Sequence, residues 1–588
     1  MKAPLFEEFE SVSFESWREC VERDLKGADF EKKLVHETLD GIALQPMYSP
    51  TDMPQNAGPL RFDRGWLTRE DVRETDPMLA RSHIEAATQR GADEVSVRIF
   101  PNDSVNLSAK HLGNLTAGID PRKTAIHWLA GPLTRPTQKA WKDALVERGI
   151  EPGSVKGSVE CDPITDRCSR WVDEPLSTWK TEFHESICCA SRGFPAATWV
   201  TVRAAIFEKA GASLAQELAW AVSILHAYLS NLPSEVSAQD LLDHAEIRFG
   251  VGTNYVLEIC KLRAARILFA NLAQLHGCTG VPKIHAVTTS SNKTIYDAHN
   301  NLLRATIESM AATIGGADSL TVAAYDQGYH CPDEFSEHLA RNTTTLLATE
   351  AHLDKVADPL AGSYTVESLT RAYAEKAWST FQQIEEQGGF ARCFENGTIE
   401  NALNEVREKR SRQIATRRRT IVGITQFANS MESKLAQVGA SQAMFQAKPV
   451  PVNEEHWTAD WLTNKAVPSS ALDLFRPSWP FENLRLRIES HVAKGNRRPL
   501  IWLLLAGDLK MRNARAAFCQ SFFAAGGYAI RQVVAEPLDA AVREALFENA
   551  DAIVVCSADD EYGHLVEQVR AVAADTKLIV AGFPADQI

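Results

Sequence analysis

The stretch AEIRFGVGTNYVLEICKLRAARILFANLAQLHG, residues 245–277, decides the fold class of this chain. Its first eight residues, AEIRFGVG, have the β-branched and aromatic content of a short strand. From Asn254 onward, apolar residues recur at the spacing of one helix face. A short strand followed at once by a long helix is the repeating unit of α/β folds with a parallel sheet.

The same strand-then-helix theme begins near residue 94 and continues for about 250 residues, the size of a (βα)8 barrel. Six further segments have the composition of strands: DEVSVRIF (93–100), KTAIHWLA (123–130), GSVKGSVE (153–160), TWVTVRAA (198–205), PKIHAVTT (282–289) and SLTVAAY (319–325). We therefore predict an α/β fold with a (βα)8 TIM-type barrel. An open doubly wound sheet is the alternative, because periodicity alone does not show whether a sheet closes.

The rest of the chain predicts three further regions. Residues 1–45 precede the barrel as an arm, and the barrel with its trailing helices spans 46–425. Residues 426–497 lose a clear period and gain Pro, Asn and Gln, as in a linker. Strands and helices alternate again over 498–588, which predicts a small flavodoxin-like domain. Such domains normally add another strand and helix after the fourth strand, so we expect a shortened C-terminus.

Composition limits the classes of partner. A chain of 588 residues is too long for one core and predicts several domains. No apolar run is long enough to cross a bilayer, so no membrane partner is expected. The N-terminal residues are acidic and lack the apolar core of a secretory signal, which predicts a cytoplasmic protein. The net charge of −14 opposes general binding of nucleic acid.

The cysteines indicate reduced thiols. There are eleven, an odd number, and no CxxC pair occurs among them. We therefore expect neither a disulfide framework nor a metal site.

Several long stretches resemble the adenosylcobalamin-dependent methylmalonyl-CoA mutase family. In the barrel region they are residues 250–272, 297–322, 338–378 and IEEQGG at 384–389. Before it, DLKGADFEKKLVHETLDGIALQPMY (24–48) is similar to the arm of the family's small subunits. The resemblance implies that residues 1–45 form an arm that contacts the partner subunit. The resemblance implies a barrel that encloses an acyl-CoA and a flavodoxin-type domain that holds cobalamin.

The residues that carry the family's radical chemistry are replaced in this chain. Where catalytic subunits of the family have Gly-Tyr-His before a QEAGA-like segment, the run TVRAAIFEKAGAS places Ala204, Ala205 and Ile206. These side chains offer no proton and no hydrogen bond to an intermediate. The family's TMY and RPWTIRQYAGF region and its FDLPTHRGYD-like strand are also missing. We expect no catalytic residue in this chain.

Three positions retain partial similarity to the family's substrate-binding residues. GSVECDPI resembles the family's GTIQNDIL, with Glu160 at the place of a functional Gln. Arg170 lies at about the spacing of the arginine that meets the substrate carboxylate, and IHAVTTSSNKT resembles THSQTSGWSLT with a histidine at His285. Glu160, Arg170 and His285 are therefore the candidate substrate-binding residues.

The loop AGDLKMRNAR (506–515) lies where the family presents Asp-x-His-x-x-Gly to cobalamin. By the resemblance, the His ligates cobalt, the Asp orients that His, and the Gly admits the nucleotide tail. When AGGYAI (525–530) is aligned with the family's second strand and the count runs back without gaps, Lys510, Arg512 and Arg515 fall at the Asp, His and Gly positions. A guanidinium has no lone pair for cobalt. His564 is the only histidine after residue 497 and is predicted to be a surface residue.

The leading hypothesis is a small, non-catalytic subunit of a methylmalonyl-CoA mutase heterodimer. Its partner would be a large catalytic subunit that carries adenosylcobalamin and the acyl-CoA, and this chain would stabilise that subunit. An alternative is an autonomous acyl-CoA mutase barrel that uses a separate cobalamin-carrying subunit. A mutase chaperone is the third reading, but the chain has no GxxxxGK[ST] nucleotide-binding loop.

Overall fold

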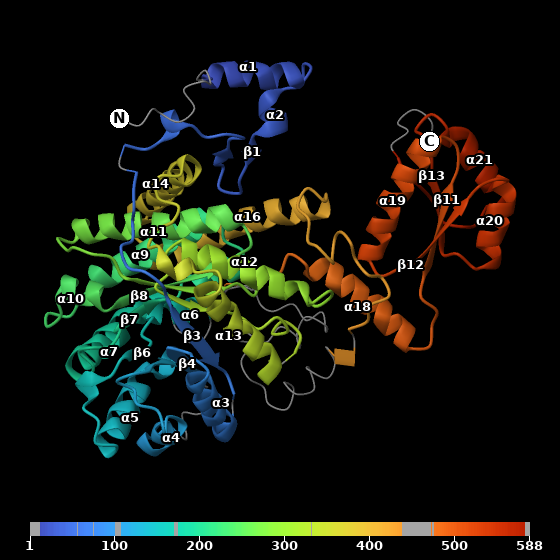
Figure 1. Ribbon diagram of the computed structural model, residues 1–588. Helices are drawn as coiled ribbons and strands as arrows, with labels where there is room; N and C mark the ends of the chain where they lie inside the picture. Colours follow the sequence, from blue (N-terminus) through green and yellow to red (C-terminus); the bar gives the residue numbers. More distant parts are fainter. Residues whose placement is uncertain are drawn as a thin grey trace.

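A parallel barrel forms the centre of the computed structural model, which describes residues 12–55, 57–74, 76–99, 107–169, 175–330, 332–434, 436–437, 472 and 475–582. Within these residues eight parallel strands curve around one axis (Figure 1). In spatial order they are β6 Gly157–Val159, β5 Ala125–Leu129, β4 Glu94–Arg98, β3 Leu67–Val72, β10 Ser319–Thr321, β9 Lys283–Thr288, β8 Ala245–Val251 and β7 Val200–Val202.

The two edge strands of this sheet meet and nearly close the barrel. Ser158 of β6 forms a parallel bridge with Thr198, just before β7, and the Thr198 N–H donates to the Gly157 carbonyl at 2.8 Å. The predicted (βα)8 barrel is confirmed, and the chain does not adopt the open-sheet alternative.

Strand β3 was absent from the predicted set of strands. Its sequence LTREDV has three consecutive charged residues and therefore lacks the apolar pattern of a buried strand. In the barrel it pairs with β4 on one side and β10 on the other. Arg69 and Glu70 point to opposite faces, and both find buried ion partners. Tertiary ion pairing thus overrides the local pattern.

Helices surround the strands, and the main apolar core lies between the two layers. They are α3 Pro77–Gln89, α4 Ala109–Leu115, α5 Thr134–Glu147, α6 Pro163–Cys168, α7 Trp179–Gly193, α8 Ala205–Lys209, α9 Leu214–Leu229, α10 Ala238–Asp243, α11 Tyr255–Leu275, α12 Asn300–Ile314 and α13 Glu334–Thr349. Helix α11 packs against α9, α12 and α14 and is buried along most of its length. This explains why its sequence is apolar beyond a single face.

The trailing helices are α14 Tyr364–Glu386, α15 Phe390–Glu395 and α16 Thr398–Ala415. Helix α18, Trp479–Ala493, lies within the predicted linker and leads to the C-terminal domain. In that domain the strands β11 Leu500–Leu505, β12 Ala529–Val534, β13 Ala552–Cys556 and β14 Leu578–Val580 are parallel in the order β12-β11-β13-β14. This order is that of a flavodoxin-type sheet.

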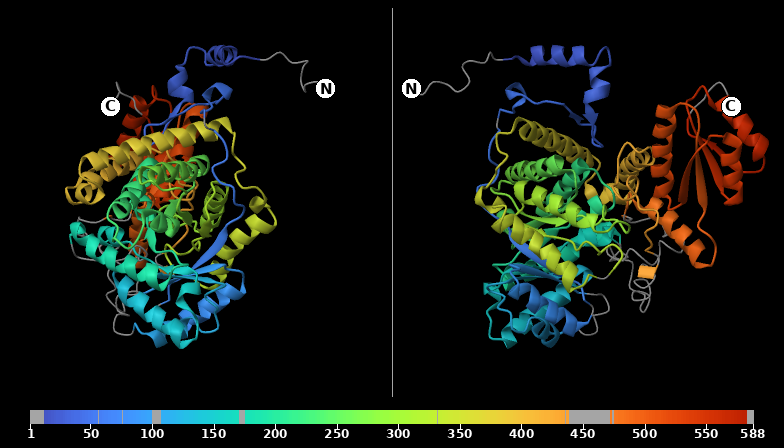
Figure 2. Two further views of the ribbon diagram at one scale, coloured as in Figure 1. Left: turned by 90° about the vertical axis from the view of Figure 1, so that its left-hand side faces the viewer. Right: turned by 45° about the vertical axis from the view of Figure 1, so that its right-hand side comes forward.

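Three helices flank the C-terminal sheet: α19 Leu509–Ala525, α20 Leu538–Phe547 and α21 Tyr562–Val572. The domain stands beside the barrel and is joined to it through α18 (Figure 2). The predicted flavodoxin-like topology of this domain is confirmed. None of the helices in the described ranges is long and apolar enough for a bilayer span.

An N-terminal arm projects from the barrel. It consists of α1 Phe14–Asp24, α2 Phe30–Leu34 and a hairpin of β1 His36–Glu37 with β2 Ala43–Leu44. Ile42, Leu44 and Tyr48 pack against the main core and anchor the base of the arm. Helix α1 has no buried residue, and both views in Figure 2 show it separated from the barrel.

Candidate functional site

Charged and hydroxyl side chains fill the barrel interior in place of the branched apolar residues that such interiors usually hold. Arg69 of β3 reaches across the barrel to Glu246 of β8, with N–O distances of 2.6 and 2.8 Å, and also binds Glu94 of β4 at 2.7 Å. His127 of β5 accompanies this group and bonds to Ser158 at 2.9 Å. The interior is therefore a network of buried polar groups that bond mainly to one another.

Two of the three predicted substrate-binding residues lie in or beside this network. Glu160 follows β6, is 4% exposed and accepts a hydrogen bond from Arg248 of β8. His285 of β9 is fully buried, with Nδ1 2.7 Å from the Ser319 hydroxyl and Nε2 3.3 Å from the Thr321 hydroxyl. Burial, followed by the field of Arg69, holds the pKa of His285 well below its usual range. Arg170 lies outside the described residues.

Arg248 lies between Glu160 and His285 and is adjacent to both. It is the register partner of His285 in the parallel pair of β8 and β9, and it binds Glu160 across β7. Sequence reasoning did not single out Arg248, Arg69 or Glu246. A signal was present in AEIRFGV, where charged residues alternate with apolar ones in a strand whose two faces are both enclosed.

The run that the sequence places where the family has Gly-Tyr-His forms part of the apolar core. Ala204, Ala205 and Ile206 follow β7 and enter the short helix α8, and each is at most 5% exposed. Next to them, the Phe475 N–H donates to the Lys209 carbonyl at 2.8 Å. The glycine at 211 (φ +98°) permits close approach here, because an added Cβ would lie 3.0 Å from Phe475. The segment after β7 is therefore packed against the chain's own residues.

Further polar groups at the carboxyl ends of the strands are also paired within the chain. Glu208 accepts a hydrogen bond from Ser291 at 2.8 Å. Asp162 accepts from the Tyr228 hydroxyl at 2.6 Å and from the Arg203 N–H at 2.7 Å. Burial raises the pKa of the neighbouring Asp166 to about 7, although Arg203 opposes the shift. These contacts tie together the segments after β6, β7 and β9.

In the C-terminal domain, the loop after β11 is filled by a glutamate. Gly507 has φ +69°, and a Cβ at this position would lie 1.9 Å from the Glu561 carboxylate. Asp508 caps helix α19 by accepting a hydrogen bond from the Met511 N–H at 2.8 Å, while its own N–H donates to Glu561 at 3.1 Å. Asp508 therefore acts as the N-cap of helix α19, and the Glu561 carboxylate fills the space next to Gly507.

The cations of this loop belong to helix α19. Arg512 pairs with Glu536 after β12, and Arg515 pairs with Asp559 after β13, both at 3.1 Å. Lys510 is exposed in the first turn of the helix. His564 is exposed on α21, where its Nε2 lies 3.3 Å from Gln568. The ion pairs join the ends of three strands at the edge where such domains bind their ligands.

The fold and these sites define a two-domain α/β protein in which a (βα)8 barrel precedes a flavodoxin-type domain. The sequence profile described as methylmalonyl-CoA mutase matches residues 83–450. The chain is 33% identical to the methylmalonyl-CoA mutase small subunit of Porphyromonas gingivalis, with 99% of this chain and 94% of that protein covered. The chain belongs to the methylmalonyl-CoA mutase family.

Two other relatives differ in how much of the chain they match. The methylmalonyl-CoA mutase small subunit of Streptomyces virginiae is 27% identical, with 97% of this chain and 91% of that protein covered. The methylmalonyl-CoA mutase of Cereibacter sphaeroides is also 27% identical, but the match covers 72% of this chain and 65% of that protein.

Proposed function

We propose that this chain is the small, non-catalytic subunit of a methylmalonyl-CoA mutase heterodimer, which interconverts methylmalonyl-CoA and succinyl-CoA. The large catalytic subunit carries adenosylcobalamin and binds the acyl-CoA, and this chain packs against that subunit and stabilises it in the cytoplasm. Support comes from relatives named small subunit that match almost the whole chain.

The observation that carries the proposal is the loop after β11. Cobalt needs a ligand with a lone pair, and the position aligned with the family's histidine is Arg512, which is ion-paired to Glu536 at 3.1 Å. The position aligned with the glycine is Arg515, which is paired to Asp559. The residues of this loop do not fit cobalamin bound through a histidine, so we assign the cofactor to the large subunit.

The barrel offers a second, independent support. Ala204, Ala205 and Ile206 replace the groups that face the reacting acyl chain in the family's catalytic subunits, and all three are buried. The barrel and the C-terminal domain would thus both have lost the residues that the family uses. Replacement at both sites is better explained by a non-catalytic subunit than by chance substitution at a single site.

The N-terminal arm is the proposed contact with the large subunit. Helix α1 has eleven residues and buries none of them in this chain, and isolated helices of this length are marginal in water. Its partly exposed Phe14 lies against Trp17, with ring centroids 5.3 Å apart, and Trp17 packs edge-on against Phe30. Val12, just before the helix, is also exposed. A partner surface would complete the burial of this small aromatic group.

Purification of the chain alone, of the large subunit alone and of the co-expressed pair tests the proposal. We expect no cobalamin and no interconversion of methylmalonyl-CoA and succinyl-CoA with the chain alone, and both with the pair. Cobalamin content by absorbance and turnover by acyl-CoA chromatography are the measurements. Bound cobalamin together with turnover by this chain alone would contradict the proposal.

The alternative, an autonomous mutase barrel that uses a separate cobalamin-carrying subunit, draws on the polar barrel interior. Glu160, its partner Arg248 and the buried His285 could contact a polar acyl group there. Addition of a separately purified cobalamin-binding subunit without a barrel of its own distinguishes the two proposals. Turnover in that mixture would favour the alternative.

Replacement of Ile206 by Ala separates a core role from a catalytic one. We expect the free energy of unfolding of the chain to fall by about 2–5 kcal/mol, because a buried side chain is truncated. The kcat of the two-subunit complex should stay unchanged. Chemical denaturation and turnover are the measurements, with Ile206→Val as the milder control. A tenfold loss of kcat in an intact complex would show that Ile206 faces the reaction.

A further inference from the structure

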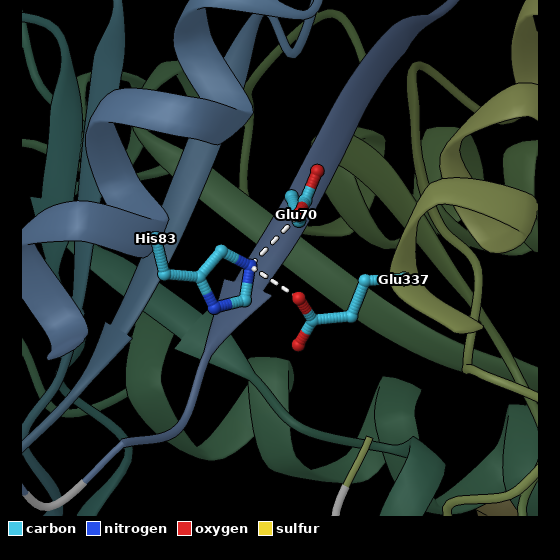
Figure 3. Close-up of side chains that lie close together, drawn as sticks. All are labelled: Glu70, His83 and Glu337. Atoms are coloured by element: carbon cyan, nitrogen blue, oxygen red, sulfur yellow. Dashed lines mark hydrogen bonds and ion pairs between the residues drawn. The ribbon is translucent and has the colours of Figure 1, made fainter. Parts of the chain in front are cut away.

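A histidine on helix α3 lies among carboxylates on the outer side of the barrel. His83 is 8% exposed, and its Nε2 is 2.8 Å from Oε1 of Glu70 on β3 and 3.4 Å from Oε2 of Glu337 on α13 (Figure 3). One ligand atom from each of these three residues can be chosen so that all lie within 4.8 Å of one another. Three different elements therefore direct one imidazole nitrogen and two carboxylates to a common point.

The other ring nitrogen of His83 has a carboxylate of its own. Nδ1 is 2.6 Å from Oε1 of Glu74, the residue that follows β3 by two positions. Metal-binding histidines almost always donate the second N–H in this way, which fixes the tautomer and leaves the first nitrogen free for the metal. Glu70 is fixed as well, because Arg341 donates to both of its oxygens at 2.6 and 2.7 Å.

A cavity of about 100 Å³ adjoins the cluster and is lined by Glu70, Glu74 and Glu337 together with Gln327 and Arg341. Two buried atoms on its lining have no hydrogen-bond partner among the described residues, the Gln327 Oε1 acceptor and the Arg341 Nη1 donor. Arg341 is 6% exposed. Buried polar atoms without partners are rare and often mark the place of a water or an ion. Water bound to a metal ion donates strongly and could serve the Gln327 oxygen, while a further water in the cavity could accept from the Arg341 N–H.

We propose that Glu70, His83 and Glu337 bind a divalent first-row transition metal ion, with Glu74 orienting the histidine. One imidazole and two carboxylates suit ions such as Zn²⁺ and Mn²⁺. In the metal-free protein the single N–H at Nε2 of His83 is shared between the carboxylate oxygens of Glu70 and Glu337. A metal ion replaces that proton and bonds to all three ligand atoms, while the cavity leaves room for water ligands. The site joins β3, α3 and α13, away from the barrel interior.

Titration of the full chain with Mn²⁺, followed by electron paramagnetic resonance, tests the site. Mn²⁺ is chosen because it favours carboxylates and avoids the cysteines of the chain. We expect about one bound ion per chain, with affinity reduced at least ~10–100-fold by Glu337→Gln or His83→Gln. Zn²⁺ should compete for the same site, which isothermal titration calorimetry measures.

Matched controls lie on the same helix, α13. Glu334→Gln removes the same charge at an exposed residue, and His338→Gln removes an exposed histidine. Both should bind Mn²⁺ as the unmodified chain does. Glu337→Gln keeps the test decisive even if His83→Gln does not fold, because the Glu337 side chain is 25% exposed at the rim of the cluster. Absence of stoichiometric binding, or unchanged binding by Glu337→Gln, would overturn the proposal.

Discussion

Replacement of Arg69 by Met is expected to lower the free energy of unfolding of this chain by about 3–5 kcal/mol. The Arg69 side chain is 1% exposed and binds Glu94 and Glu246 across the barrel interior. Removal of the guanidinium leaves two buried carboxylates without their counter-charge. Chemical denaturation of the purified chain measures the loss.

Two variants make this prediction specific. Arg81→Met removes an exposed cation paired to Glu85 on the same helix and should change the free energy of unfolding by no more than about 0.5 kcal/mol. Joint replacement of Arg69, Glu94 and Glu246 by apolar residues of similar volume should recover much of the loss, because neither carboxylate is then left buried without its counter-charge. A small effect of Arg69→Met would mean that water reaches the barrel interior.

The same ion pairs predict a pH dependence. Burial alone would raise the pKa of Glu94 and Glu246, but the Arg69 guanidinium outweighs burial and holds both pKa values well below the usual range. The stabilisation by these carboxylates is therefore present above the unfolded-state pKa of about 4.3 and is lost as the pH falls further. Without Arg69, burial raises the pKa of both carboxyl groups, so these groups take up protons in the variant at a higher pH than in the unmodified chain. The difference in stability between the unmodified chain and Arg69→Met should therefore be largest above those raised pKa values and should shrink steadily as the pH falls below them.

Removal of the residues before Val35 is expected to weaken association with the large subunit about 100-fold or more, if the arm forms the proposed contact. Aromatic anchors at interfaces contribute about 2 kcal/mol or more each, and the deletion removes Phe14, Trp17 and Phe30 together. The melting temperature of the chain alone should change little, because helix α1 has no buried residue, and Phe30, the buried residue of α2, contacts Trp17 and Arg18 of the same deleted segment. Association by calorimetry and thermal unfolding are the measurements.

The outcome of the deletion depends on which surface holds the partner. Phe547→Ala alters an aromatic side chain that is 85% exposed on α20 and serves as the control for loss of any exposed aromatic. If the shortened chain still binds the large subunit with unchanged affinity, the arm is not the contact, and the proposed interface must lie elsewhere. A large fall in the melting temperature would instead assign the arm to the stability of this chain.

Most of the barrel could be predicted from the sequence because its helices and strands have strong local periodicity. The segment 245–252 was expected to be a strand, and the structure places β8 at Ala245–Val251. Strand β3 could not be found in this way, since Arg69 and Glu70 look like solvent-facing residues until their partners are known. Those partners are distant in sequence, with Glu246 177 positions and Arg341 271 positions away.

For the candidate sites as well, some features could be predicted from the sequence and others could not. A replaced residue such as Arg512 is visible in a sequence once the family motif is known, whereas its pairing with Glu536 is not. The proposed metal site had no sequence signal, because Glu337 lies 254 positions beyond His83 and neither belongs to a motif with ligand spacing. Sequence reasoning therefore predicted no metal site.

The sequence by itself determined the alternation of strands and helices, the order of the two domains and the resemblance to one enzyme family, because these features depend on local patterns and long matching segments. Only the tertiary structure decided which charges meet. Closure of the barrel sets β3 beside β10 and opposite β8, so that Arg69 reaches Glu246 inside the barrel while Glu70 meets His83 and Arg341 outside it. In a closed barrel the neighbours of a strand are set by the path of the whole sheet, and a local pattern carries no information about that path.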